Sequence, residues 1–198
     1  MKPTRWSLSG FIASAGFASG DRILVAHWTD SPLGPLTDVL WTRPDGERVL
    51  LVPDQPAADF VTSVYDVDRV DIVPVKAGVG ERWLELDAGP LEVQLKAAAG
   101  WRIPFPRPLW FTRFVEAPVA RSLLGVQAYD TTASGVHVWY RADVHRRIVT
   151  GWATAEGRDL GALGSRPSIV AVRPLLEDPS GRLDEVIRRA ARHRVSSP

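Results

Sequence analysis

The chain has 198 residues, of which 45% are hydrophobic and 24% charged, with a net charge of +1 and no cysteine. These values are typical of one soluble globular domain, so we expect a single domain over residues 1–198. The lack of cysteine excludes disulfides, thiolate nucleophiles and cysteine-ligated metals. The balanced charge and the absence of a long apolar run argue against nucleic acid and membranes as partners.

The N-terminal stretch MKPTRWSLSGFIASAGFASG has some features of a secretory signal, including Lys2, Arg5 and the sequence ASA. Serines and Gly10 interrupt its apolar residues, so we favour an ordinary first strand. The lack of cysteine also fits a reducing cytoplasm, and we expect a cytoplasmic protein.

Strand signals follow. The run DRILVAHWTD is rich in β-branched and aromatic residues and ends at the turn SPLGP. The run LTDVLWTRPDGERVLLVPD predicts a hairpin, in which Asp45-Gly46 supplies the positive φ of a tight turn. In QPAADFVTSVYDVD, apolar residues recur at helical spacing and predict a short helix; they are Ala57, Phe60, Val61 and Val64.

Three further strands are predicted by RVDIVPVKAG, RWLELDAG and LEVQLKAAAG, the last two as a hairpin. Pro74 restricts its strand to an edge, a first position or a bulge. Residues 101–124 combine four prolines with five Trp and Phe residues and predict a helical insert. Three roles are open for this insert. It could cover the core, which we favour, or it could close over a barrel mouth as a lid. It could also anchor the chain at a membrane interface.

Strands then return in VQAYDTT, VHVWYRADVHRRIVTGWATAEG and SIVAVRPLLE. The second of these is too long for one straight strand, which predicts a bulge or bend near Arg146-Arg147. A C-terminal helix is predicted over about residues 179–194, capped by Asp178. The fold class is therefore mainly β (α+β). We expect an antiparallel, closed or nearly closed barrel with a few flanking helices, because closure protects the sheet edges.

Polar residues alternate with apolar ones along the long strand. Two readings of this polar row stay open: a solvated strand face, which is the more common case, or the lining of an internal cavity. The row consists of His137, Trp139, Arg141, Asp143 and His145.

Within this row, Asp143 and His145 could hydrogen-bond as an acid/base pair, and Arg141 could hold a carboxylate through its two-pronged guanidinium. His27 falls on the same strand face as Ile23 and Val25. It is a core histidine in the simpler reading and a ligand-binding residue in the other. The spacing of the histidines indicates no metal site.

The scarce lysines are further catalytic candidates, because a lysine in an apolar pocket can attack a carbonyl as a free amine. Lys76 follows the Val70, Ile72, Pro74 side of its strand and is the easier of the two to bury. Lys96 shares a face with polar residues and is expected in solvent. The motifs of nucleotide-binding loops, zinc proteases, serine hydrolases and calcium loops are absent, and we expect no cofactor.

The stretches GDRILVAHWTDSPLGPLTDVLW, VHVWYRADVHRRIVTGWA and RDLGAL, with the Pro/aromatic insert between them, resemble the layout of the acetoacetate decarboxylase-like superfamily. The arginine-rich composition points to an actinobacterial branch. The resemblance implies a wide antiparallel barrel with an internal cavity. Decarboxylases of that family carry adjacent lysines, which this chain lacks, so no catalytic residue is carried over.

Three functions follow as expectations. The first is binding of a small, partly apolar molecule, such as a carboxylic acid or a ketone, in an internal cavity. The second is a lyase- or decarboxylase-like enzyme that uses a lysine amine or the Asp143–His145 pair. The third is an interaction protein or homo-oligomer that docks through residues 101–124.

Overall fold

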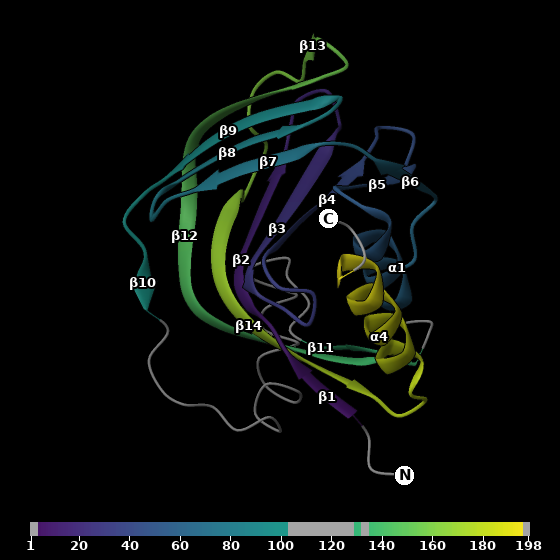
Figure 1. Cartoon of the computed structure of the whole chain (residues 1–198). Helices are drawn as coiled ribbons and strands as arrows, with labels where there is room; N and C mark the ends of the chain where they lie inside the picture. Colours follow the sequence, from purple (N-terminus) through teal and green to yellow (C-terminus); the bar gives the residue numbers. More distant parts are fainter. Residues whose placement is uncertain (1–3, 103–128, 132–134, 196–198) are drawn as a thin grey trace.

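The computed structural model describes residues 4–102, 129–131 and 135–195. Within these residues, one continuous sheet curls into an open half-barrel with two limbs (Figure 1). Along the hydrogen-bonded path its strands follow the order β6-β5-β4-β3-β2-β14-β12-β9-β8-β7. The long strand β12 joins the two limbs, and two helices lie beside the first limb.

The first limb contains β1 (Thr4–Ser7), β2 (Ser9–Gly16), β3 (Arg22–Asp30), β4 (Leu36–Thr42), β5 (Arg48–Val52), β6 (Arg69–Ile72) and β14 (Ser168–Asp178). The second contains β7 (Val75–Val79), β8 (Trp83–Ala88), β9 (Leu91–Ala97) and β13 (Arg158–Asp159). Strand β12 (His137–Ala155) also pairs with β10 (Trp101–Arg102) and β11 (Tyr129–Thr131). The helices are α1 (Gln55–Val64) and α4 (Arg182–Val195).

Two predicted hairpins and the predicted short helix in the first half of the chain are confirmed. Strands β4 and β5 form the predicted hairpin, and Gly46 at its turn has a φ of 96°. Strands β8 and β9 form the second hairpin. Helix α1 begins after Asp54, whose carboxylate accepts a hydrogen bond from the Ala57 amide at 2.8 Å, the usual role of an N-cap. The four apolar residues that predicted this helix are all buried.

The sheet is open, so the predicted closed or nearly closed barrel is wrong. The reason lies in the run RVDIVPVKAG, which forms two strands instead of one. Strand β6 pairs in parallel with β5, whereas β7 pairs with β8 at the other end of the sheet. Pro74 lies between them and has no N–H for a ladder hydrogen bond. The two edges are therefore linked by the chain and not by strand pairing.

Strand β12 is continuous over 19 residues but shifts its register twice. One shift lies between Ala142 and Val144 against β14, and the other lies between Ile148 and Thr150 against β9. The bend predicted near Arg146-Arg147 thus falls between two actual irregularities. They allow β12 to leave the first limb and continue into the second.

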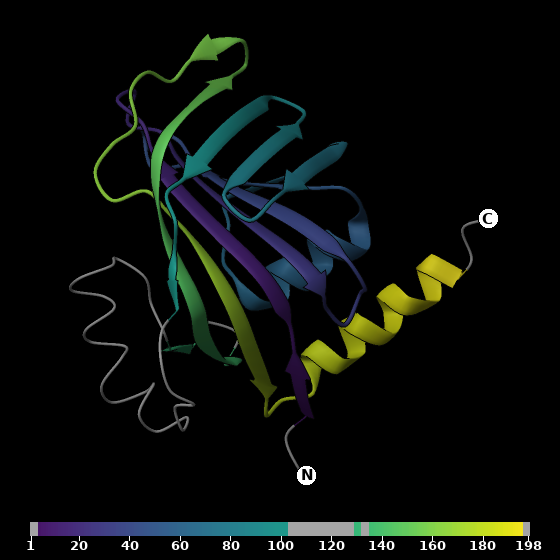
Figure 2. The same cartoon turned by 90° about the vertical axis from the view of Figure 1, so that its left-hand side faces the viewer.

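Two hydrophobic cores lie on opposite faces of the first limb. One fills the concave side between the limbs and includes Ile23 and Val25 of β3. The other lies between the sheet and the helices and includes Ala26 and Trp28 of the same strand. Figure 2 shows α1 and α4 on the face of the first limb that is turned away from β7, β8 and β9. The first limb is therefore buried on both of its faces.

The C-terminal helix begins at Arg182, three residues later than predicted. Asp178, the predicted cap, is buried and accepts a hydrogen bond from the Leu183 amide at 2.6 Å. Of the predicted insert 101–124, only Trp101 and Arg102 are among the described residues, as strand β10. Neither described helix has the length and apolar character needed to cross a membrane.

We predict that Gly10→Ala destabilises the sheet by about 1–3 kcal/mol, the usual cost of overpacking. Strand β2 has a register shift between Ser9 and Gly10, and a Cβ on Gly10 would overlap the His27 carbonyl oxygen and lie 2.9 Å from the Trp28 Cα. Urea-induced unfolding measures the change.

Gly16→Ala in the same strand is the control, because its Cβ would meet no atom closer than 3.8 Å. Equal stability of the two variants would show that β2 and β3 are not tightly spaced at Gly10.

Candidate functional site

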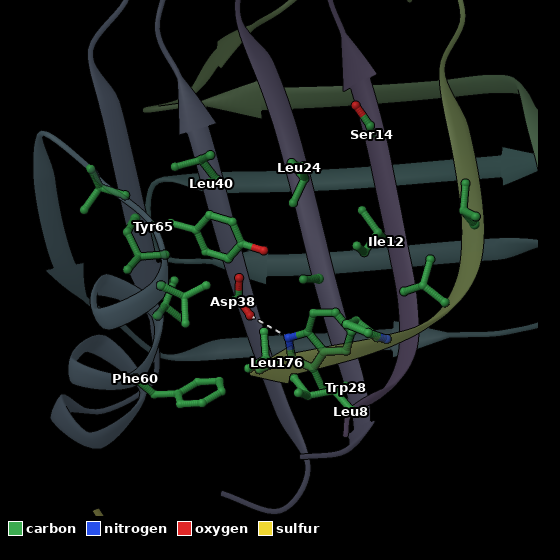
Figure 3. Close-up of a pocket in the computed structure, with 18 of the residues that line it drawn as sticks. Leu8, Ile12, Ser14, Leu24, Trp28, Asp38, Leu40, Phe60, Tyr65 and Leu176 are labelled. Atoms are coloured by element: carbon green, nitrogen blue, oxygen red, sulfur yellow. Dashed lines mark hydrogen bonds between the residues drawn. The ribbon is translucent and has the colours of Figure 1, made fainter. Parts of the chain in front are cut away.

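A cavity of about 270 Å³ lies between the first limb and helix α1 (Figure 3). It is on the helix side of the sheet, within the second core, and not in the concave interior where the sequence predicted a pocket. Strands β2, β3, β4 and β14 form its floor and α1 with the following loop forms its roof. Its lining includes Ile12, Leu24, Ala26, Leu40, Phe60, Val64, Tyr65, Val170 and Leu176.

The floor consists of cross-strand rows that the register brings together. Ser14, Leu24 and Leu40 form one row, and Ile12, Ala26 and Asp38 form the next. Every second residue of these strands points to the helix side. Ala26 stands in the middle of its row, and its methyl group leaves a space that a larger side chain would fill.

The cavity has an open and a closed end. Ser14 and Tyr65 are exposed and Leu24 is half-buried, which places the mouth at their end of the floor. Trp28 and Phe60 are buried at the other end. In Figure 3 the Tyr65 ring lies above the floor between Leu40 and Asp38, so this side chain borders the entrance.

Asp38 is the acidic residue of the lining, and its side chain is among the most protected polar groups in the described chain, with 7% exposure for the residue. One carboxyl oxygen, Oδ1, accepts a hydrogen bond from the Trp28 indole N–H at 3.0 Å. Burial raises the pKa of Asp38 to about 7, although the Trp28 hydrogen bond acts in the opposite direction. The carboxyl group is therefore largely neutral in weakly acidic solution.

The remaining lining is nearly free of charge. It contains no lysine, arginine or histidine, and its other polar side chains are those of Ser14, Trp28, Tyr65 and Ser168. No cation is thus available within the cavity to stabilise an ionised Asp38. The arrangement combines a mainly apolar space with one carboxyl group that changes charge near neutral pH.

The predicted polar row on β12 is not one row. Val138 pairs with Leu176 and belongs to the helix-side core, so His137, Trp139 and Arg141 point to the opposite face. Asp143 is the extra residue of the bulge between Ala142 and Val144. Beyond it the faces exchange, and His145 pairs with Val170, a lining residue of the cavity. A one-residue shift reverses the face of every later side chain, so the prediction of one face for all five is wrong.

The predicted Asp143–His145 pair is also absent. The Asp143 carboxylate accepts two hydrogen bonds from the Arg173 guanidinium, at 2.6 and 2.8 Å. Its Oδ1 lies 3.8 Å from the Nε of Arg141. His145 is half-buried, and desolvation lowers its pKa. The rings of His137 and Trp139 are neighbours, with centroids 5.8 Å apart. A ligand-binding role for this group stays a prediction.

His27 lies on the same face as Ile23 and Val25, as predicted, and directly opposite Phe11. Its Nδ1 is 2.8 Å from the Thr37 hydroxyl oxygen, and burial lowers its pKa. This side of the sheet is the concave one, so His27 does not face the cavity. Its contact with Thr37 is the arrangement of a histidine satisfied within the sheet.

The two lysines lie at the surface. Lys96 is exposed, as expected, whereas Lys76 is exposed and not buried as the sequence suggested. Lys76 borders an open groove of about 530 Å³ on the outer face of the second limb, together with Glu85, Asp87 and Trp152. An amine in this solvated groove lacks the apolar surroundings in which a lysine acts as a nucleophile. A metal-binding group of three or more His, Asp or Glu residues is absent from the described ranges.

Sequence reasoning missed Trp28, Asp38 and Tyr65 as site residues. A signal for Asp38 was present in the run LTDVLWT, where an aspartate stands between Leu36 and Leu40 on one strand face. An acidic residue on such a face is either paired or neutral. The roof could not be inferred, because it depends on how α1 packs across strands distant in sequence.

No family model matches the chain, and neither does any curated protein. The resemblance to the acetoacetate decarboxylase-like superfamily therefore stays a prediction. A solved structure of a protein named "putative AttH" from Nitrosomonas europaea aligns with 87% of this chain at 10% identity and a TM-score of 0.22. This chain spans 51% of that protein, and a similarity this weak carries no argument about function.

We predict that Asp38→Asn removes a pH dependence of stability. In the unfolded chain Asp38 ionises at its ordinary pKa of 3.8, but in the fold it ionises at about 7. The folded state thus holds the proton more tightly, and the wild type loses stability as the pH rises between these values. The loss is roughly 4 kcal/mol, at ~1.4 kcal/mol for each unit of pKa shift.

The free energy of unfolding, measured by urea titration from about pH 4 to about pH 8, tests this linkage. The free energy of unfolding of the variant should rise relative to that of the wild type as the pH increases through that range. Asp30→Asn, at the exposed end of β3, is the control and should follow the wild type. Parallel pH profiles for the wild type and Asp38→Asn would show that Asp38 is ionised in the fold.

Proposed function

We propose that the protein binds a small, mainly apolar molecule in the cavity between the first limb and α1. The observation that carries this proposal is the cavity itself, about 270 Å³ in volume and lined by aliphatic and aromatic side chains. Known small-molecule pockets have this character, with an apolar lining and a few polar groups, and are mostly somewhat larger.

The volume sets the size of the ligand. At about 30 Å³ for each water-sized group, the cavity has room for about nine such groups. An apolar space of this size holds water poorly, because water needs two to four polar partners. A ligand that fills it replaces missing van der Waals contacts and removes its own apolar surface from water.

Binding is preferred to catalysis because the cavity contains one carboxyl group, which accepts its hydrogen bond from Trp28, and its lining holds no lysine or histidine. Lys76 lies in the open groove of the other limb, and Asp143 is engaged by Arg173. The decarboxylase-like alternative therefore has no observation in its favour. Docking of a partner through residues 101–124 remains a separate prediction, since residues 103–124 lie outside those described.

We predict that Ala26→Leu abolishes most binding of a small apolar probe such as nonane. The added three carbons would occupy the centre of the floor, where Ala26 is 3% exposed. The leucine would displace ligand groups of the same size. Each displaced CH₂ group costs ~0.8 kcal/mol of binding free energy, so the affinity falls roughly fiftyfold. Isothermal titration calorimetry measures the affinity.

Thr62→Leu is the matched control, because it adds an apolar side chain to the exposed face of α1, outside the cavity. This variant should bind the probe as the wild type does. Unchanged affinity of Ala26→Leu, with the fold intact by circular dichroism, would refute the proposed binding site.

A further inference from the structure

We propose that the ligand of this cavity is an uncharged molecule with an apolar body and one acceptor oxygen, such as a ketone, which receives a hydrogen bond from the protonated carboxyl group of Asp38. This inference rests on the proposed function and specifies its ligand class.

The position of the Asp38 carboxyl group is fixed from one side. Trp28 and Asp38 are diagonal neighbours on β3 and β4, since Trp28 pairs with Leu36 and Ala26 pairs with Asp38. The indole N–H holds Oδ1, and within the described part of the chain Oδ2 has no hydrogen-bond partner. Figure 3 shows the second oxygen pointing along the floor towards the Tyr65 end of the cavity. A ligand that enters there meets this oxygen.

The surroundings favour the neutral form of this group. A buried carboxylate needs a cation or several N–H donors, and Asp38 has a single indole N–H. Burial accordingly raises its pKa to about 7. In the neutral form Oδ2 carries a hydrogen that must be donated to an acceptor. No lining side chain is hydrogen-bonded to Oδ2, so this hydrogen is available to an acceptor oxygen of a ligand.

The charged and titratable groups around Asp38 do not change this conclusion. Tyr65, whose ring borders the entrance, is the other titratable residue in the lining. His27, on the neighbouring strand, points to the opposite face of the sheet. His145 shares the cross-strand row of Asp38 but lies four strands away along the sheet. The cavity-facing residues of α1, β14 and β5 are apolar except for Ser168 and Tyr65.

Other ligand charges fit less well. An amine would form an ion pair with ionised Asp38, but both charges would lose their hydration in an apolar space without further hydrogen bonds. A carboxylate would be repelled once Asp38 ionises, and the lining offers it no cation. A neutral carbonyl oxygen accepts the hydrogen bond at little desolvation cost.

The protonation state then sets the direction of the pH dependence. Asp38 donates a hydrogen bond only below its pKa, and a bound acceptor raises that pKa further. The contribution of this hydrogen bond to the affinity for a neutral acceptor ligand is therefore complete in acid and is lost as the pH rises through about 7. An amine would show the opposite trend, and a hydrocarbon would show none.

Three probes with equal numbers of non-hydrogen atoms test the inference: methyl hexyl ketone, octylamine and nonane. Calorimetry at about pH 5 and about pH 9 samples Asp38 almost entirely in one form or the other. We expect the ketone to bind about tenfold more tightly at the lower pH, the size of one net hydrogen bond. Nonane should bind with the same affinity at both pH values.

Two variants of Asp38 separate hydrogen bonding from cavity filling. Asp38→Asn keeps an N–H donor at the same place, so it should bind the ketone at both pH values. Asp38→Leu should bind nonane but lose any preference for the ketone. The infrared carbonyl stretch of the bound ketone should lie at lower frequency in the wild type at about pH 5 than in Asp38→Leu.

The two proposals fail in different ways. If nonane binds, but the ketone binds no more tightly than nonane and its affinity does not depend on pH, the inference about the acceptor is wrong. The proposed binding cavity would then remain. Tighter binding of octylamine than of the ketone would also overturn it. If neither nonane nor the ketone binds the wild type, both proposals are wrong.

Discussion

The structure depends on burial of the first limb on both faces. Strand β3 directs Ile23 and Val25 into the concave core and Ala26 and Trp28 into the helix-side core. Hydrophobic burial of this kind is the main favourable contribution to folding. Since the sheet separates two cores, each is packed independently, and a small residue on one face leaves a space that the other cannot fill. The cavity above Ala26 lies at such a point.

Asp38 shows how an acidic residue can remain in such a core. An isolated buried carboxylate is very costly, and proteins usually neutralise such a group by shifting its pKa. Here the Trp28 indole supplies one hydrogen bond, and protonation removes the charge. The ionised form of this group costs stability at alkaline pH. Perturbed groups of this kind in apolar pockets are common at binding sites.

Local structure could be predicted from the sequence where local chemistry determines it. Asp45-Gly46 fixed a hairpin turn, and the spacing of Ala57, Phe60, Val61 and Val64 fixed a helix. Sheet closure and the cavity could not be predicted, because they depend on pairings between distant strands. The run RVDIVPVKAG shows this: nothing local indicates that its halves join opposite edges.

The bulge at Asp143 also has a consequence for how the chain tolerates change in length. Before it, even-numbered residues of β12 such as Val138 face the helices; after it, even-numbered residues such as Ile148 face the concave core. The alternation of side chains between the two faces of β12 thus shifts by one residue at the bulge. Because Asp143 is the unpaired extra residue, removing it would restore one-to-one pairing with β14 and leave Ile148 facing the concave core, whereas removing a paired residue from a strand without a bulge would reverse the face of every later side chain in that strand.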